Sequence, residues 1–166
     1  MSTAGTVLLA GGTGMIGQTL SISLVERGYH VIVLSRNPPL RNAITEFARW
    51  DPEQGRMDME AFLRADYIIN LAGASVAEKR WTRSRKKLIL DSRIQSAQTI
   101  VNYLNNYDHK VKAVVNSSAI GWYGPDPVIP NLQPFTENHP AYSDYLGNTC
   151  RQWEEAIDPV HQAGIR

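Results

Sequence analysis

The chain has 166 residues, of which 43% are hydrophobic and 20% charged, and its formal net charge is +1 at pH 7. This length suits one domain with a substantial core, and the balanced charge argues against a nucleic-acid or membrane-surface partner. Cys150 is the single cysteine, and no apolar run approaches the ~20 residues of a membrane span. We therefore expect a cytoplasmic protein without an intramolecular disulfide.

A glycine-rich stretch links the first two predicted elements. A short apolar run ending at Ala10 predicts a buried strand, and residues 15–27 predict an amphipathic helix. Glycines recur between them at a three-residue spacing: the first permits a tight turn, the second lets the backbone approach a pyrophosphate, and the third lets the helix pack closely on the strand. The free N–H groups and positive dipole of the helix start add an anion site. The sequence therefore predicts a nucleotide-binding loop, the alternative being a glycine-rich turn without a ligand, and its residues are Gly11, Gly12, Thr13, Gly14, Met15, Ile16 and Gly17.

The end of the second predicted strand, residues 30–35, bears on the choice of cofactor. A site that prefers NAD usually has an acidic residue here, which hydrogen-bonds the ribose hydroxyls. This chain has Ser35, Arg36 and Asn37 instead. A planar, permanently charged guanidinium suits a 2′-phosphate, so we expect NADP rather than NAD, held by Ser35 and Arg36. The alternative is a surface arginine ahead of the Pro38-Pro39 turn.

Strands and helices alternate through the next part of the chain. A short third strand is expected near the end of residues 43–50, a helix over 58–65, and a fourth strand over 67–73. This alternation predicts an α/β fold, a doubly wound parallel sheet of about five strands with helices on both faces. Its ligand crevice lies beyond the carboxyl ends of the strands. Asn70, Ala72 and Gly73 fall there and are small enough to let a cofactor lie across them. The residues of this segment expected to bind the cofactor are Leu71, Ala72 and Gly73.

Residues 79–87 contain six basic side chains and no acidic one, namely Lys79, Arg80, Arg83, Arg85, Lys86 and Lys87. A solvated helix start and a phosphate contact for cofactor or substrate are both consistent with this run. A nucleic-acid site is disfavoured, because Trp81 is the single aromatic residue within it.

A long helix is expected from this basic run to about Tyr107. Its apolar residues recur at spacings of three and four, which predicts one stripe packed against the sheet. Part of the same face is a candidate contact in a homodimer. The stripe consists of Leu90, Ile94, Ala97, Val101 and Leu104.

The fifth strand, expected over residues 111–116, ends in two serines. Ser117 would lie against the cofactor, and the hydroxyl of Ser118 can polarise a carbonyl or hydroxyl group of a substrate. A functional loop is expected over 120–140 and a largely helical segment over 141–162. The four histidines are scattered without ligand spacing, so no metal site is predicted, and Cys150 is expected to be a packed thiol.

Several of these segments together resemble the extended short-chain dehydrogenase/reductase superfamily. They are the Gly-x-x-Gly-x-x-Gly loop after a strand, Asn70-Leu71-Ala72-Gly73, Ser117-Ser118 and Tyr123-Gly124. Further segments narrow the resemblance to its epimerase-family branch, whose members are described as NAD(P)-dependent nucleotide-sugar epimerases or as cell-division-inhibitor-like proteins. These segments are Trp50-Asp51-Pro52, 79–82, 91–94, 118–124 and 150–154.

The resemblance implies that residues 1–166 are the N-terminal Rossmann domain of a longer protein whose C-terminal substrate lobe is absent. It implies reversible hydride transfer on a nucleotide sugar, with Ser118 orienting the substrate and Tyr123 or Tyr145 transferring the proton. This fragment alone is expected to be inactive. The superfamily's Tyr-x-x-x-Lys pair is missing, because Leu146 follows Tyr142 at that spacing and Thr149 follows Tyr145. The rival hypothesis is therefore a non-catalytic module that signals NADP occupancy to a protein partner.

Overall fold

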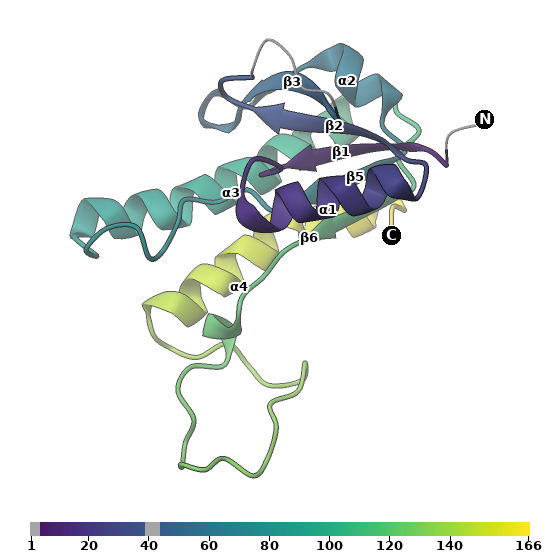
Figure 1. The fold of residues 1–166 in the computed structure, drawn as a ribbon. Coiled ribbons are helices and arrows are strands. Elements are labelled where there is room, and N and C mark those ends of the chain that lie inside the picture. The colour runs from purple at the N-terminus through teal and green to yellow at the C-terminus, as the bar shows by residue number, and fades with distance from the viewer. Residues whose placement is uncertain (1–3, 39–43) are drawn as a thin grey trace.

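The computed structural model describes residues 4–38 and 44–166. Its centre is a six-stranded sheet in the order β4-β3-β2-β1-β5-β6 (Figure 1). All neighbouring pairs are parallel except β3 and β4. The strands are β1 (Thr6–Ala10), β2 (His30–Ser35), β3 (Glu46–Asp51), β4 (Arg56–Met57), β5 (Tyr67–Asn70) and β6 (Ala113–Asn116).

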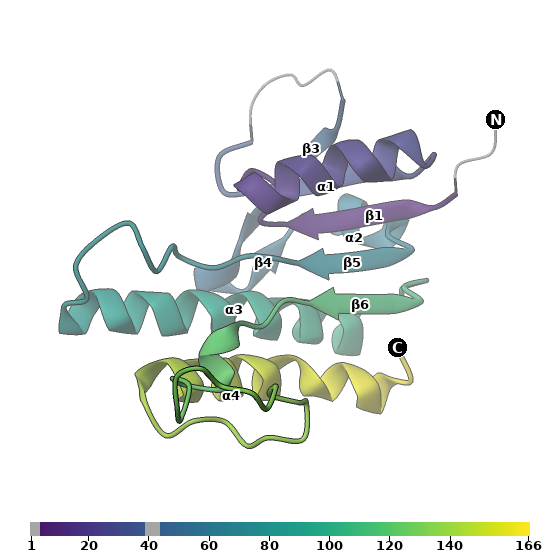
Figure 2. The same cartoon turned by 60° about the horizontal axis from the view of Figure 1, so that its bottom comes forward.

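Helices cover both faces of this sheet, as Figure 2 shows. Helix α1 (Met15–Glu26) lies on one face. The other face is covered by α2 (Met59–Arg64) and α3 (Arg83–Asn106), and α4 (Tyr145–Ile157) packs against α3. Short 3-10 turns occur at Pro52–Gln54, Ile120–Trp122 and Asp158–Ala163. The predicted doubly wound α/β fold is confirmed.

The central strands are buried on both faces because their side chains alternate between two apolar layers. Leu9 and Val33 face α1, where they pack against Leu24. Leu8 and Ile32 face the opposite layer, which also contains residues of α2 and α3. Near-continuous apolar runs therefore mark these strands in the sequence.

The number of strands differs from the prediction. Strand β4 is added by a tight hairpin: β3 ends at Asp51, whose side chain accepts a hydrogen bond from the N–H of Gln54 (3.3 Å), and Gly55 adopts a left-handed φ of +64°. Two residues are too few to show an alternating pattern, so the sequence carries no periodic signal for this strand. Residues 71–73, expected to continue the fourth strand, form a loop instead. Two predicted features lie partly outside the described residues: Ala43, the first residue of the segment expected to contain the third strand, and Pro39 of the expected Pro38-Pro39 turn.

Helix α3 buries a wider face than the predicted stripe. Ala97, Val101 and Leu104 are buried as expected, whereas Leu90 and Ile94 are only half-buried. Ile89, which the stripe does not include, is fully buried. The helix packs against α4 as well as the sheet, and its first half extends beyond the strands (Figure 1). Because α3 packs against both the sheet and α4, its buried face is wider than the single apolar stripe that was predicted.

The segment between β6 and α4 is a long loop that projects away from the sheet (Figure 1). The indole N–H of Trp122 donates to the carbonyl oxygen of His139 (2.7 Å), and the N–H of Tyr142 donates to the carbonyl oxygen of Trp122 (2.7 Å). Asp144 then caps α4 by accepting from the N–H of Gly147 (2.8 Å). Within residues 4–38 and 44–166, no helix is long and apolar enough to cross a membrane.

The carboxylate of Asp66 joins several segments at the amino ends of the parallel strands. Asp66 accepts a hydrogen bond from the N–H of Thr6 (2.9 Å) and pairs with Lys110 (3.4 Å) and Lys112 (3.5 Å). The Thr6 N–H and the two lysines hold the pKa of the Asp66 carboxyl below its usual value. The carboxylate therefore stabilises the fold, fully so above the pKa of an unfolded aspartate.

Acid should remove this stabilisation in a defined window. The contribution of Asp66 is present above about pH 4, the ordinary aspartate pKa, and is lost as pH falls through the lower folded-state value. We expect Asp66→Asn to flatten the fall in unfolding free energy as pH drops below about 4, measured by urea denaturation. Asp108→Asn, at an exposed position, serves as the control, and equal slopes for the two variants would contradict this role.

Candidate functional site

The backbone of the turn from β1 into α1 requires glycine at Gly11 and Gly17. Gly11 has a φ of +79°, and a Cβ there would lie 2.7 Å from the carbonyl carbon of Leu71. A Cβ on Gly17 would overlap the carbonyl oxygen of Gly11. Gly14 differs, because the nearest atom to its Cβ would be that same oxygen at 3.4 Å. The first and third glycines are therefore needed by the fold, and the second leaves room for a ligand.

The first turn of α1 carries none of the usual helix-start stabilisers. Its N-cap is Gly14, which provides no side-chain cap, and the first turn contains no acidic residue. The side chains of Met15 and Ile16 are 84% and 65% exposed. This turn therefore presents unneutralised N–H groups and the positive end of the helix dipole, which suit a phosphate.

The carboxyl ends of β1, β5 and β6 lie side by side. Ala10 is paired with Asn70, which is paired with Asn116. The Asn70 side chain is completely buried, and its amide donates to Asn116 Oδ1 (2.7 Å) and to Ser96 Oγ (3.2 Å). Its Oδ1 accepts from the N–H of Ala72 (3.2 Å). One buried amide thus fixes the loop after β5 against α3 and β6.

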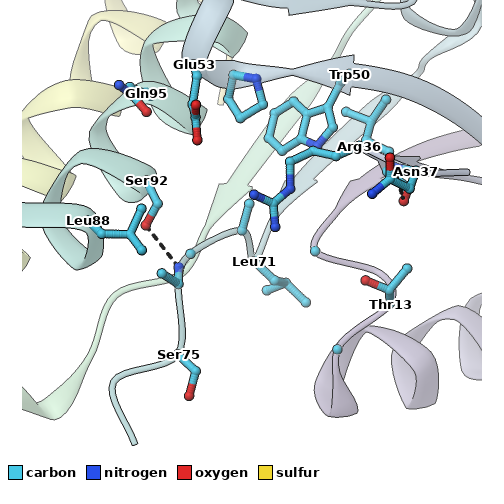
Figure 3. A pocket seen from close by; sticks show the side chains of 18 of the residues that line it. Thr13, Arg36, Asn37, Trp50, Glu53, Leu71, Ser75, Leu88, Ser92 and Gln95 are labelled. Atoms are coloured by element: carbon cyan, nitrogen blue, oxygen red, sulfur yellow. Dashed lines mark hydrogen bonds between the residues drawn. The ribbon is translucent and has the colours of Figure 1, made fainter. Parts of the chain in front are cut away.

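Helix α3 holds the same loop from a second side. The N–H of Ala74 donates to Ser92 Oγ (2.9 Å), as Figure 3 shows, and Arg93 donates to the carbonyl oxygen of Ala74 (3.0 Å). Burial lowers the pKa of the Arg93 guanidinium, which lies 5.0 Å over the ring of Trp153. Further along, Arg85 donates to the carbonyl oxygen of Ser75 (2.6 Å). The loop after β5 is therefore fixed without any ligand.

An open cavity of about 480 Å³ crosses these strand ends (Figure 3). Several of the residues predicted to bind the cofactor line it: Gly11, Thr13, Gly14, Ser35, Arg36, Leu71, Ala72 and Gly73. The glycine loop, the end of β2 and the loop after β5 thus meet around one space. This is the position in which parallel α/β sheets bind ligands.

Arg36 is exposed and lies beside Trp50 at the β2 side of the cavity (Figure 3). Trp50 is 5% exposed and belongs to β3, the neighbour of β2. No carboxylate follows β2 directly, although Glu53 lines the cavity from the turn after β3. The end of β2 therefore presents a cation and hydroxyl to a ligand.

The remaining predicted cofactor residues do not line the cavity. Gly12 is buried, and a Cβ there would lie 2.7 Å from a methyl group of Val33. Gly17 is buried beneath the turn, while Met15 and Ile16 are exposed on α1. The hydroxyl of Ser117 donates to the carbonyl oxygen of Asn70 (3.1 Å). The environments of Gly12, Gly17 and Ser117 are those of residues that shape the site.

The three residues predicted to be catalytic point to different surroundings. The hydroxyl of Ser118 donates to Glu154 Oε1 on α4. The hydroxyl of Tyr145 donates to the carbonyl oxygen of Lys86 (2.9 Å), and its ring packs against Trp81. The ring of Tyr123 stacks on Phe135 with centroids 5.1 Å apart. In the part of the chain that the structure describes, no hydrogen bond joins Ser118 to the hydroxyl of Tyr123 or Tyr145.

Sequence reasoning missed several residues of the cavity. Trp50 could have been predicted, because it lies near the carboxyl end of β3 and the carboxyl ends of parallel strands border the ligand crevice. Polar residues on α3 carry no such signal, because which face of a long helix meets the cavity depends on its packing. The missed residues are Leu34, Asn37, Trp50, Pro52, Glu53, Ala74, Ser75, Glu78, Leu88, Ser92 and Gln95. Arg85 also lines the cavity and belongs to the basic run for which a phosphate contact was one of the open interpretations.

The basic run lies at the start of α3, beyond the carboxyl ends of the strands (Figures 1 and 2). Arg85 pairs with Glu78 (3.0 Å) and Lys87 pairs with Asp91 (2.5 Å). The ammonium of Lys86 lies 4.8 Å from the ring centre of Tyr145. Apart from residues 1–3 and 39–43, no group of three or more His, Cys, Asp or Glu side chains could hold a metal ion.

A glycine loop between the first strand and helix, opening into a cavity across parallel strand ends, defines a Rossmann-type nucleotide-binding domain. A family model matches residues 7–146, and the chain belongs to the NAD dependent epimerase/dehydratase family. The resemblance predicted from the sequence motifs is therefore confirmed.

Relatives and solved structures agree with this assignment. The chain is 33% identical over 162 residues to "Epimerase family protein Mb2239" of Mycobacterium bovis, covering 96% of this chain and 50% of the relative. It resembles the crystal structure of human epimerase family protein SDR39U1 (isoform 2) with NADPH, at 27% identity and a TM-score of 0.75, covering 92% of this chain and 48% of that one. UDP-galactose 4-epimerase, at 21% identity and a TM-score of 0.76, shares the fold over 97% of this chain and 53% of its own. The chain thus spans about half the length of the curated relatives it matches.

Proposed function

We propose that this chain is the NADP-binding domain of an oxidoreductase or epimerase that works by hydride transfer on a nucleotide sugar. The observation that carries the choice of NADP is Arg36, which lines the cavity directly after β2 where an NAD site usually has a carboxylate. The NADPH in the human relative's crystal structure supports the same choice.

The residues present fit a dinucleotide. The uncapped start of α1 suits the pyrophosphate, and the open side of Gly14 leaves space for it. Ser35 and Arg36 suit the 2′-phosphate, and the fixed loop after β5 provides a floor. NADP, when bound, supplies the hydride acceptor or, in its reduced form, the donor. The exposed hydroxyl of Ser118, at the end of β6, would orient the substrate oxygen.

The basic start of α3 supports a substrate that carries phosphate groups. Lys79, Arg80 and Arg83 are exposed and make no ion pair within the described ranges. They stand next to Glu78 and Arg85, which line the cavity. Arg83 lies in the first turn of α3, where the helix dipole repels a cation, and an anionic ligand would relieve this repulsion. A nucleotide sugar has such an anion in its diphosphate.

The test is turnover by the full-length protein with NADPH or its oxidised form and the probes UDP-glucose and UDP-galactose. Hydride transfer followed by the absorbance of the reduced nicotinamide, together with interconversion of the two sugars, is the expected result. Cofactor binding without turnover of any carbonyl or alcohol probe would overturn the hydride-transfer part of the proposal.

A specific observation favours the second hypothesis, a non-catalytic module that reports NADP occupancy. The chain lacks Tyr-x-x-x-Lys, and the hydroxyl of Tyr145 is engaged with a backbone carbonyl. This hypothesis predicts a protein partner that is recovered only with the NADP-loaded form. Recovery of the same partner with and without NADP would contradict it.

Cytoplasmic location and self-association complete the proposal. The single cysteine suits a reducing compartment. A homodimer through the long helices stays a prediction; α3 already packs against α4 of the same chain, so the dimer would use the outer sides of these helices. Light scattering that gives the mass of one chain at all concentrations would contradict the homodimer.

A further inference from the structure

Three polar side chains gather where β6 ends against α4. The exposed hydroxyl of Ser118 donates to the half-buried Glu154. One helical turn earlier, the thiol of Cys150 lies 3.5 Å from the carbonyl oxygen of Ala119, and Ser118 also contacts this thiol. Residues four apart on a helix share a face, so Cys150 and Glu154 together line the end of β6.

This cluster lies within reach of the cofactor cavity. The ends of β1, β5 and β6 are aligned by the pairing of Ala10, Asn70 and Asn116. Because neighbouring strands are about 4.8 Å apart, the end of β6 lies about 10 Å from the end of β1. A dinucleotide that starts at the glycine loop and extends across the strand ends would approach Ser118.

The two tyrosines predicted to transfer the proton, Tyr123 and Tyr145, are engaged elsewhere. Tyr145 begins α4, and with a rise of about 1.5 Å per residue it lies about 13.5 Å along the helix from Glu154. Its hydroxyl already donates to the carbonyl oxygen of Lys86 (2.9 Å). Tyr123 stacks on Phe135 in the projecting loop. The observed hydrogen-bond acceptor for Ser118 lies instead on α4, at Glu154.

Glu154 is the group in this cluster that can accept a proton. Burial raises the pKa of the Cys150 thiol, which therefore stays protonated. Arg93, the charged group that faces the cluster from α3, lies over Trp153 and cannot act as a base. Arg151, on the same helix as Glu154, is paired with Glu155 (2.7 Å). Glu154 makes no ion pair in the described part of the chain, so its carboxylate is free to serve Ser118.

We infer that Glu154, acting through the Ser118 hydroxyl, takes up and returns the proton of the reaction in place of the missing Tyr-x-x-x-Lys pair. The inference rests on the proposed hydride transfer. In the oxidising direction, the substrate's hydroxyl proton passes to Ser118 Oγ while the Ser118 proton passes to Glu154 Oε1. The O–H electron pair becomes the second carbonyl bond as the carbon loses its hydride to the nicotinamide. The carbon is oxidised, the nicotinamide is reduced, and Glu154 ends protonated; reduction reverses each transfer.

The test compares Glu154→Gln with Glu155→Gln, an exposed neighbour on the same helix, in the full-length protein with UDP-glucose and oxidised NADP as probes. Glu154→Gln should lower kcat by about 100-fold or more, remove the acidic limb of the pH profile, and leave NADPH affinity unchanged. Glu155→Gln should match the wild type, and Glu154→Asp should restore part of the rate.

A second readout needs neither cofactor nor turnover. In the carbon-13 spectrum of the cofactor-free protein, Ser118→Ala should move the Glu154 carboxyl resonance and leave that of Glu155 in place. Wild-type kcat and pH profile in Glu154→Gln would overturn the inference alone. NADPH binding without hydride transfer in the wild type would overturn the proposed function and the inference with it.

Discussion

Replacing Arg36 with alanine is expected to weaken NADPH binding by roughly 10- to 100-fold and to leave NADH binding within about twofold. Arg36 is exposed, lines the cavity and directly follows β2. Its guanidinium would meet the 2′-phosphate, the group that NADPH has and NADH lacks. A charge-assisted hydrogen bond is worth about 1.5–3 kcal/mol, which sets the expected range.

Arg27→Ala is the matched control for this variant. Arg27 closes the far end of α1 and donates to the carbonyl oxygen of Ser23 (3.1 Å), away from the cavity. The control removes the same charge and should change neither affinity. Titration of nicotinamide fluorescence measures both cofactors, and an equal loss of NADPH and NADH in Arg36→Ala would contradict the 2′-phosphate contact.

Gly17→Ala should lower the stability of the fold, whereas Gly14→Ala should lower the affinity for NADPH. At Gly17 the new Cβ overlaps the carbonyl oxygen of Gly11, a clash that costs about 3 kcal/mol. Alanine gains about 1 kcal/mol over glycine inside a helix, so the clash dominates and the net loss is about 2 kcal/mol. For a domain of this size, Tm should fall by about 4–8 °C.

At Gly14 the new Cβ has its nearest neighbour at 3.4 Å and faces the cavity. Gly14→Ala should therefore keep the unfolding free energy within about 1 kcal/mol of the wild type and weaken NADPH binding instead, because the methyl group occupies the space for the pyrophosphate. Thermal denaturation and cofactor titration on both variants separate the two roles. A stable Gly17→Ala protein, or unaltered NADPH affinity in Gly14→Ala, would contradict the roles assigned to these glycines.

The parts of the fold that were predictable are those governed by local rules. Gly17 is required by contacts within one strand-turn-helix unit, and Gly11 by the left-handed φ of the turn itself, so their spacing alone predicts the loop. Buried parallel strands such as β1 and β2 can be recognised in the sequence as apolar runs. The ends of these strands indicate where the crevice of a parallel sheet lies, which is why Arg36 and Gly73 could be predicted to border the cavity.

The parts that were not predictable depend on contacts between distant segments. Ser118 and Glu154 are 36 residues apart, and only the packing of α4 beside β6 brings them together. Tyr145 was a reasonable catalytic candidate by residue type, but its position at the start of α4 turns its hydroxyl toward Lys86. Arg85 and Ser92 reach the cavity because α3 passes beneath the loop after β5. None of these outcomes is encoded in spacing along the chain.

The central claim is that this chain folds into an NADP-binding domain. Calorimetric titration of residues 1–166 with NADPH and NADH side by side tests it most directly. We expect saturable NADPH binding with one site per chain and at least tenfold weaker NADH binding, the difference that a 2′-phosphate contact of about 1.4 kcal/mol or more produces. Heat from neither cofactor, in a chain shown to be folded by circular dichroism, would contradict the claim.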